Sequence, residues 1–222
     1  MEKLFKIIFY LSLFFLILFF YTRNLSLFNH FYKNIKEIKN PNDLDVLVNK
    51  NNRLNKYYVP SDLVLMDLRY SKENKYLREI AYENYKKLSD DAAKLGYKII
   101  ITSAYRDYYY QENLYNYYVK EKGEDYADKC SARPGHSEHQ TGLAIDVMGS
   151  NNDYNLFEDS KEFSWMINNS YKYGFILRYP KGKENITGFK YEPWHYRYVG
   201  KDIAKYIYEN NLTLEEYKKR TN

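Results

Sequence analysis

The chain has 222 residues, a net charge of +5 and a charged fraction of 28%. That length allows one sizeable domain, with or without an additional anchoring segment. The basic residues are spread along the chain without a long run, which argues against a nucleic-acid partner. The single cysteine, Cys130, excludes an intramolecular disulfide and a zinc site built from paired cysteines.

The N-terminus has the features of a membrane signal. Lys3 and Lys6 precede an almost uninterrupted apolar run over residues 7–21. A helix from Leu4 to Tyr21 would be about 27 Å long, close to the thickness of the hydrocarbon core of a bilayer. The basic flank places the N-terminus in the cytoplasm and the remaining chain outside. We therefore predict a transmembrane anchor helix over residues 1–22, in preference to a cleaved signal peptide, because no Ala-x-Ala-like cleavage site follows.

The segment after the predicted anchor is polar and rich in Asn and Lys, and we predict a tether over residues 23–50. The folded domain is predicted over residues 51–222. Apolar residues at helical spacing predict its first helix over Asn74–Leu95, and Gly96 provides a stop signal after it. The short, β-branched stretch Tyr97–Ser103 is predicted to be a strand.

The second half of the chain predicts short helices alternating with strands. Asp107 is a candidate N-cap for a helix over Asp107–Glu121. The other predicted elements are a loop over Gly123–Pro134, a strand over Leu143–Met148, a helix over Ser160–Tyr173, a strand over Phe175–Tyr179, a loop over Pro180–Lys190, a strand over Trp194–Val199, and helices from Lys201 and from Thr213, the last capped by Thr213 and Glu216. This order favours antiparallel pairing and predicts an α+β fold: a small antiparallel sheet that carries the site, flanked by helices.

Two separated segments hold the side chains of greatest chemical interest. His139 and Asp146 lie seven residues apart, with Gly142 between them to bend the chain, and His195 lies in the last predicted strand. Two imidazoles and a carboxylate can hold a catalytic zinc ion and leave its fourth position open for water. Glu192, three residues before His195, can take a proton from that water and pass it to a leaving amine. The combination predicts a zinc hydrolase.

Three more polar residues are candidates for contacts with the substrate. Arg106 follows a predicted strand at the start of a helix, where a guanidinium can stabilise the oxyanion that forms when water attacks a carbonyl. Gln111 and Ser137 can each hydrogen-bond a substrate. Other interpretations stay open. Arg106 could instead be a surface salt-bridge partner, His136 an alternative metal ligand, and Cys130 a small filler residue or a nucleophile.

The pattern Ser-x-His-x6-Asp, followed by Glu-x-x-His, is complete in this chain, as is an upstream Ser-x-Tyr-Arg with a Gln five residues after the Arg. This ordered set resembles the VanY-type D-alanyl-D-alanine carboxypeptidases of the zinc-dependent lysostaphin/D-Ala-D-Ala/hedgehog-like group. The resemblance covers about residues 45–199. It implies zinc binding by His139, Asp146 and His195, a catalytic base at Glu192, transition-state stabilisation by Arg106, and contacts of Ser137 and Gln111 with the peptide terminus.

The implied reaction is hydrolysis that removes the terminal D-alanine from a peptidoglycan stem peptide, at a D,D or an L,D bond. The implied substrate lies outside the membrane, so we expect an extracytoplasmic catalytic domain that the N-terminal helix holds at the cell membrane. We also expect the protein to be a monomer. Two other functions remain open: an endopeptidase of the same fold, and a non-catalytic module that binds the cell wall. Glu192 argues against the second, because a structural zinc ion needs no base.

Overall fold

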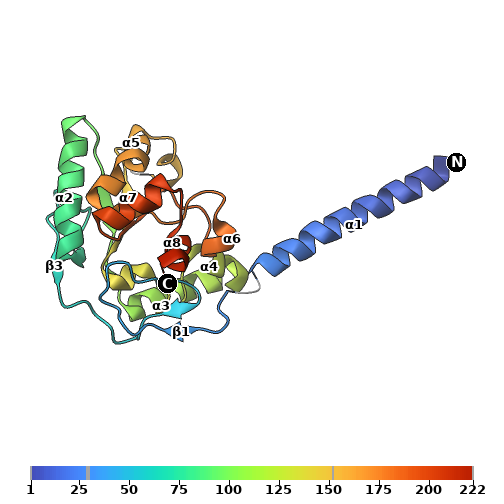
Figure 1. Ribbon diagram of the computed structural model, residues 1–222, viewed down its shortest axis with the longest axis horizontal. Helices are drawn as coiled ribbons and strands as arrows, with labels where there is room; N and C mark the ends of the chain where they lie inside the picture. Colours follow the sequence, from blue (N-terminus) through green and yellow to red (C-terminus); the bar gives the residue numbers. More distant parts are fainter. Residues whose placement is uncertain (1, 29–30, 152, 222) are drawn as a thin grey trace. The chain divides into compact units, whose positions relative to one another are not determined.

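The computed structural model describes residues 2–28, 31–151 and 153–221. The chain divides into two compact units, Met1–Lys33 and Asn34–Asn222. The first unit contains helix α1 (Glu2–Phe28), so the helix predicted at the N-terminus is present (Figure 1). Its expected passage through a membrane is not supported: within the described residues, no helix is both long enough and apolar enough to cross one.

A four-stranded sheet forms the centre of the second unit, with the strand order β5-β6-β8-β7. These strands are β5 (Ile100–Ser103), β6 (Ala144–Met148), β7 (Phe175–Leu177) and β8 (His195–Tyr198). Each neighbouring pair is antiparallel. The two central strands, β6 and β8, are buried along their whole lengths. The predicted α+β fold with a small antiparallel sheet is confirmed.

The two central strands give the sheet an apolar face and a polar face. Ile145 and Tyr196 belong to the main hydrophobic core, together with the buried side of α2 (Glu79–Lys94). Successive side chains of a strand point to opposite faces. Asp146 and His195, the sequence neighbours of these two core residues, therefore project from the other face of the sheet. The burial of the apolar face thus fixes which side chains reach the site.

The remaining elements of this unit are α3, a helix of 15 residues, and several shorter segments (Figure 1). They are β1 (Lys36–Glu37), β2 (Asn52–Arg53), β3 (Leu63–Leu65), β4 (Tyr76–Arg78), α3 (Tyr108–Lys122), α4 (Glu124–Cys130), η1 (Glu138–Thr141), η2 (Tyr154–Leu156), α5 (Lys161–Asn169), η3 (Ser170–Tyr173), α6 (Glu184–Thr187), α7 (Lys201–Glu209) and α8 (Leu214–Thr221), where η marks a 3-10 helix.

Two helix starts have the predicted caps. The Asp107 side chain accepts a hydrogen bond of 2.6 Å from the backbone N–H of Tyr110, which fixes the first turn of α3. At α8, Thr213 Oγ1 accepts from the Glu216 N–H at 3.2 Å, and the Glu216 carboxylate accepts from the Thr213 N–H at 2.8 Å. This reciprocal pair is the predicted capping box.

Several predicted boundaries were wrong. The helix predicted from Asn74 begins only at Glu79, because residues 76–78 form β4 and pair with β3. Leu77 is fully buried from that strand, so its place in the apolar pattern is compatible with either structure. Within the predicted loop Gly123–Pro134 lies helix α4, which is too short to show a helical period and buries only Ala127. The loop predicted over residues 180–190 likewise contains α6.

Part of the segment expected to be a tether lies within the second compact unit. Val46 and Val48 are buried there and pack with Leu54 in a small cluster of their own. The domain boundaries at residues 22 and 50 stay predictions.

Candidate active site

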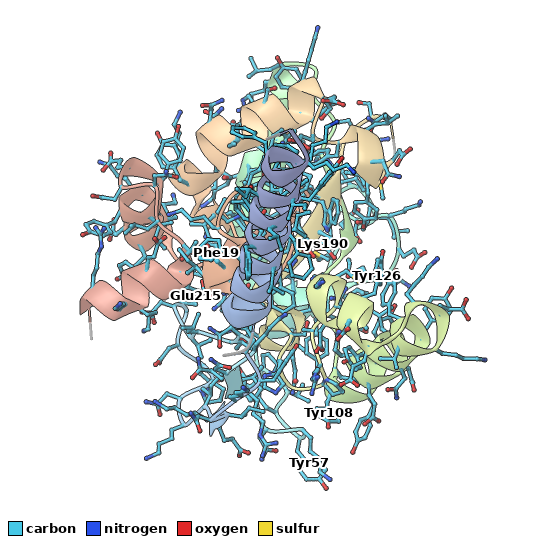
Figure 2. All side chains as sticks on the ribbon, turned by 90° about the vertical axis from the view of Figure 1, so that its right-hand side faces the viewer. Phe19, Tyr57, Tyr108, Tyr126, Lys190 and Glu215 are labelled. Atoms are coloured by element: carbon cyan, nitrogen blue, oxygen red, sulfur yellow. The ribbon has the colours of Figure 1, made fainter. Side chains whose placement is uncertain are left out.

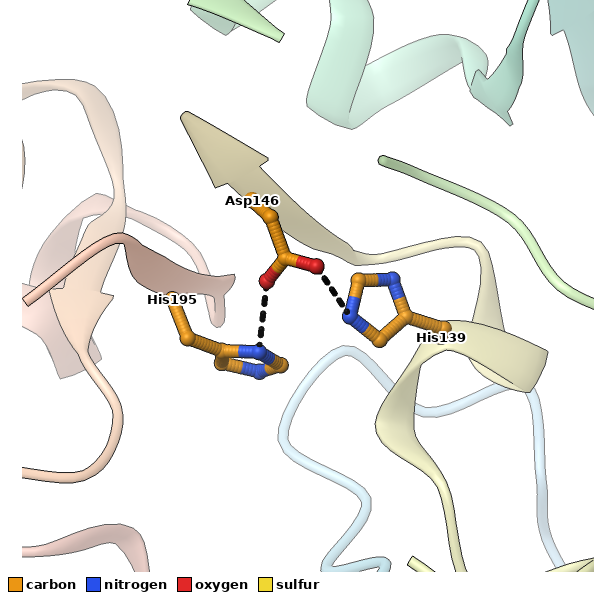
Figure 3. Close-up of side chains that lie close together, drawn as sticks. All are labelled: His139, Asp146 and His195. Carbon is orange, nitrogen blue, oxygen red and sulfur yellow. Dashed lines mark hydrogen bonds and ion pairs between the residues drawn. The ribbon is translucent and has the colours of Figure 1, made fainter. Parts of the chain in front are cut away.

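The register of the sheet brings two of the predicted ligands together. Asp146 on β6 is paired with His195 on β8, and Ser103 on β5 pairs with Asp146 from the other side. His195 Nδ1 lies 3.0 Å from Asp146 Oδ1. His139 approaches from η1, with its Nε2 3.3 Å from Asp146 Oδ2 (Figure 3). Potential ligand atoms of the three residues lie within 4.8 Å of one another, so the structure assembles the predicted triad.

His139 is fixed by the tight turn that carries it. Ser137 caps η1 through its Oγ, which accepts from the His139 N–H at 3.4 Å. Gly142 ends the turn at φ 64°, and an added Cβ would meet side-chain atoms of Leu63 and Arg78 at 2.8 and 2.9 Å. Only glycine fits both the positive φ and this close approach. The bend that the sequence predicted at Gly142 is confirmed.

The hydrogen bond at the back of the His139 ring selects its tautomer. Nδ1 lies 2.6 Å from the carbonyl oxygen of Ala104, which can only accept, so Nδ1 carries the proton and Nε2 keeps its lone pair. Burial lowers the pKa of His139 to about 4, and the nearby charge of Arg106 adds to this. The imidazole is therefore neutral at pH 7, as a metal ligand must be.

The three side chains fit a bound cation. Burial would raise the pKa of Asp146, but the neighbouring His139 and His195 lower it well below its usual value, so this carboxylate is ionised. The lone pair of His139 Nε2 therefore faces a negatively charged oxygen at 3.3 Å. Nε2 is buried and has no hydrogen-bond partner among the described residues. Two electron-pair donors held this close need a positive charge between them.

Glu192 lies beside the triad, three residues before the start of β8. Its Oε2 lies 3.7 Å from His195 Nδ1, and only 13% of its side chain is exposed. Burial raises the pKa of Glu192 to about 7, against the opposing effect of His195. A carboxylate with a pKa close to the working pH is suited both to take up a proton and to release it. The structure thus brings Glu192 next to the triad, and its role as the base stays a prediction.

Arg106 and Gln111 form a second part of the site. The guanidinium of Arg106 donates to Ser103 Oγ at 2.9 Å and lies 3.6 Å from Asp146 Oδ2. Its Nε donates to Gln111 Oε1 at 3.1 Å, while the Gln111 amide donates to Ser131 Oγ at 3.1 Å. Arg106 is thus part of the buried site and not a surface salt-bridge partner. Gln111 lies behind it and orients it.

A cavity of about 380 Å³ surrounds this set of side chains. Of the predicted site residues, it is lined by Arg106, Ser137, His139, Asp146, Glu192 and His195; Gln111 is not among the lining residues. One wall comes from the end of α4 and the residues that follow it, Ser131 and Ala132. Near the start of the same helix, Lys190 lies over the Tyr126 ring at 4.7 Å (Figure 2). Cys130 lies in that wall, with its Sγ 3.8 Å from the Ala127 carbonyl oxygen. Burial raises the pKa of this thiol, so it is a poor nucleophile.

His136, the alternative ligand, lies outside the triad. Its Nδ1 is 2.8 Å from the carbonyl oxygen of Asn49. Among the described residues, the group of side chains able to share a metal ion is His139, Asp146 and His195.

Residues 74–201 match the VanY family, D-alanyl-D-alanine carboxypeptidase. This chain belongs to the VanY family. The putative carboxypeptidase YodJ of Bacillus subtilis (strain 168) is 45% identical to it over 205 residues, which cover 86% of this chain and 75% of the relative. The resemblance seen in the sequence motifs is confirmed, and so is the predicted class of enzyme.

Solved structures of family members have the same fold. One is the LdcB LD-carboxypeptidase, whose structure reveals the basis of its peptidoglycan recognition. Its TM-score is 0.79 at 45% identity, and the match covers 84% of this chain and 91% of that one. The vancomycin resistance D,D-pentapeptidase VanY from the VanB-type cassette, solved in complex with Zn(II), has a TM-score of 0.68 and 33% identity over 78% of this chain and 98% of that one.

Sequence reasoning missed several residues of this VanY-family site. Tyr154 and Trp194 line the cavity, with ring centroids 5.2 Å apart. Glu138, Arg178 and Arg197 form a fully buried charged cluster beside His195. One signal was present in the sequence: an arginine inside a predicted core strand, as at Arg197, requires a buried partner.

Proposed function

We propose that this protein is a zinc-dependent carboxypeptidase that hydrolyses the bond before the terminal D-alanine of peptidoglycan stem peptides. The observation that carries the proposal is the facing pair of donor atoms, His139 Nε2 and Asp146 Oδ2, 3.3 Å apart inside the cavity that also holds Glu192. Family membership supports the peptide class, and the Zn(II) complex of the related VanY pentapeptidase supports the choice of metal.

The chain offers His139, Asp146 and His195 as zinc ligands, a donor set that suits zinc and leaves a coordination position free. When bound, zinc supplies a Lewis acid and lowers the pKa of a coordinated water. The nitrogen of each imidazole that faces Asp146 must then carry no proton, so that its lone pair is free for the metal ion. At His139 the Ala104 carbonyl already ensures this.

Glu192 takes the proton of the attacking water and delivers it to the nitrogen of the leaving D-alanine. Arg106 presents a guanidinium, fixed by Ser103 and Gln111, to the carbonyl oxygen as negative charge develops there. Ser137 lines the same cavity and is available to the peptide terminus. Gln111 acts through Arg106, because its own amide group is engaged with Ser131.

The similarity to solved relatives favours an L,D bond. The chain is 45% identical to the LdcB LD-carboxypeptidase and 33% identical to the D,D-pentapeptidase. We therefore expect a tetrapeptide stem to be preferred over a pentapeptide stem. The test is incubation of the zinc-loaded protein with tetrapeptide, pentapeptide and cross-linked stems, followed by mass spectrometry. Release of D-alanine from the tetrapeptide supports the proposal. Release from the pentapeptide alone shows that the enzyme prefers a D,D bond. Cleavage only within cross-linked stems identifies an endopeptidase.

The catalytic domain acts outside the cytoplasmic membrane in this proposal, because stem peptides of the mature wall lie there. This proposed location rests on the place of the substrate alone, because no helix among the described residues is long and apolar enough to cross a membrane. Fractionation of cells that express the full chain with a C-terminal tag tests the location. Protease added to intact spheroplasts removes the tag if the domain is outside and leaves it if the domain is inside.

A further inference from the structure

A fully buried carboxylate lies directly behind the metal triad. Glu138 is the residue before His139, and its side chain has no solvent exposure. Its Oε1 accepts two charge-assisted hydrogen bonds of 2.8 Å, one from Arg178 Nε and one from Arg197 Nη1. Both arginines also have fully buried side chains. A cluster of this kind persists only where every charge is paired.

The second oxygen of this carboxylate faces a predicted metal ligand. Glu138 Oε2 lies 3.6 Å from His195 Nε2. Neither of these two buried atoms has a hydrogen-bond partner within the part of the chain that the structure describes. The other ring nitrogen of His195, Nδ1, faces Asp146 at 3.0 Å. The imidazole is thus held between carboxylates on both sides, with Glu138 at Nε2, and Asp146 and the more distant Glu192 at Nδ1.

The cluster extends to segments outside the residues that match the family. Arg178 donates to both oxygens of Glu215 in α8, with distances of 2.8 and 2.7 Å. Arg197 Nη2 donates to the carbonyl oxygens of Leu44 and Val46, at 2.9 and 3.0 Å. Residues 44, 46 and 215 all lie outside the matched range 74–201. The N-terminal part of the domain and its last helix therefore both connect to the back of His195.

We propose that Glu138 is a positioning residue that holds the proton of His195 on Nε2, so that the Nδ1 lone pair is available to the metal ion, and that Glu215 acts through Arg178 to fix Glu138 in place. This inference rests on the proposed zinc site. A carboxylate behind a ligating imidazole sets its tautomer and orientation and strengthens it as a ligand. Because apolar residues can replace a buried ion cluster with little loss of stability, orientation of the ligand is the function that accounts for these charges.

The substitution Glu138→Gln tests the tautomer without changing the size of the side chain. Arg178 and Arg197 both donate to the same oxygen, so the Gln carbonyl must face them and its NH₂ group must face His195 Nε2. An NH₂ group there can only donate, which moves the ring proton to Nδ1 and removes that nitrogen as a ligand. We expect zinc affinity to fall about 10- to 100-fold, as for other partners of metal ligands.

The measurement is competition for zinc between the full-length protein and a chromophoric chelator, with circular dichroism to verify that each variant is folded. The visible absorption spectrum of the Co(II)-substituted protein is the second readout, since loss of an imidazole ligand changes its bands. Neither readout depends on catalysis. A protein that binds zinc but releases no D-alanine would refute the proposed activity and still leave this inference open to the same test.

Glu215 and Glu216 provide a matched pair of variants on α8. Glu215→Gln removes the negative charge that pairs with Arg178, and we expect a several-fold loss of zinc affinity. Glu216→Gln removes the ion pair with Lys183 and keeps an acceptor for the cap at Thr213. Neither contact touches the cluster, so this variant should leave zinc affinity unchanged. If Glu138→Gln does not fold, the zinc affinity and the Co(II) spectrum of Glu215→Gln test the inference. Wild-type zinc affinity and an unchanged Co(II) spectrum in a folded Glu215→Gln or Glu138→Gln protein would overturn the inference.

Discussion

Glu192→Gln is the substitution that isolates the proposed base. The side chain keeps its size, and Gln at this position cannot accept a proton. Glu192 is not one of the three predicted ligands, and its Oε2 lies 3.7 Å from His195 Nδ1, so zinc binding should survive. General base catalysis contributes about 10²- to 10⁴-fold to a rate, which corresponds to about 3–5 kcal/mol of activation free energy. We expect kcat/KM for release of D-alanine to fall within that range.

The pH profile gives the same prediction an independent readout. The pKa of Glu192 is about 7, and a dication in the triad moves it downward, so the midpoint of the acid limb should lie at or below about 7. Below that midpoint the base is protonated and kcat/KM of the wild type should fall about tenfold per pH unit. The limb should be absent in Glu192→Gln. A zinc-loaded variant with wild-type kcat/KM would refute Glu192 as the base.

Three further predictions follow from individual contacts. Arg106→Lys should lower kcat about 10²- to 10³-fold in steady-state assays, because an ammonium cannot contact Ser103 and Gln111 together. Leu77→Ala should cost about 2–5 kcal/mol in urea unfolding, because Leu77 is fully buried in the main core. Burial lowers the pKa of Lys50 to about 8. Above pH 8 the unfolded chain keeps a proton on Lys50 that the folded protein has lost, so the free energy of unfolding should rise with pH. Lys50→Met should remove this pH dependence.

The chemistry of the site could be predicted from sequence because its key residues are rare and ordered. The chain has four histidines, and His139, Asp146, Glu192 and His195 occur in the order and spacing of the two motifs. Their approach in space depends on the sheet: the register that pairs Asp146 with His195 follows from burial of Ile145 and Tyr196 on the opposite face. The motifs therefore identified the candidate ligands, and strand alternation explains why the fold brings Asp146 and His195 together.

The pairing within the charged cluster could not be predicted, because ion pairs between distant segments have no local pattern. Glu138 lies in a tight turn, where a glutamate is normally solvated, and Arg178 and Glu215 are 37 residues apart. Strand β4 was missed for a related reason, since its pairing with residues 63–65 is a tertiary contact. Local periodicity identifies the buried face of an element and leaves its partner undefined.

The most direct test of the account is a zinc titration of metal-free protein with a tetrapeptide stem as substrate. A chelator first removes bound metal, and zinc is then returned in substoichiometric steps while D-alanine release is followed by mass spectrometry. We predict no release from the metal-free protein, and a linear rise in rate that ends at about one zinc ion per chain, as three ligands for a single ion require. Full D-alanine release by the metal-free protein would contradict the account.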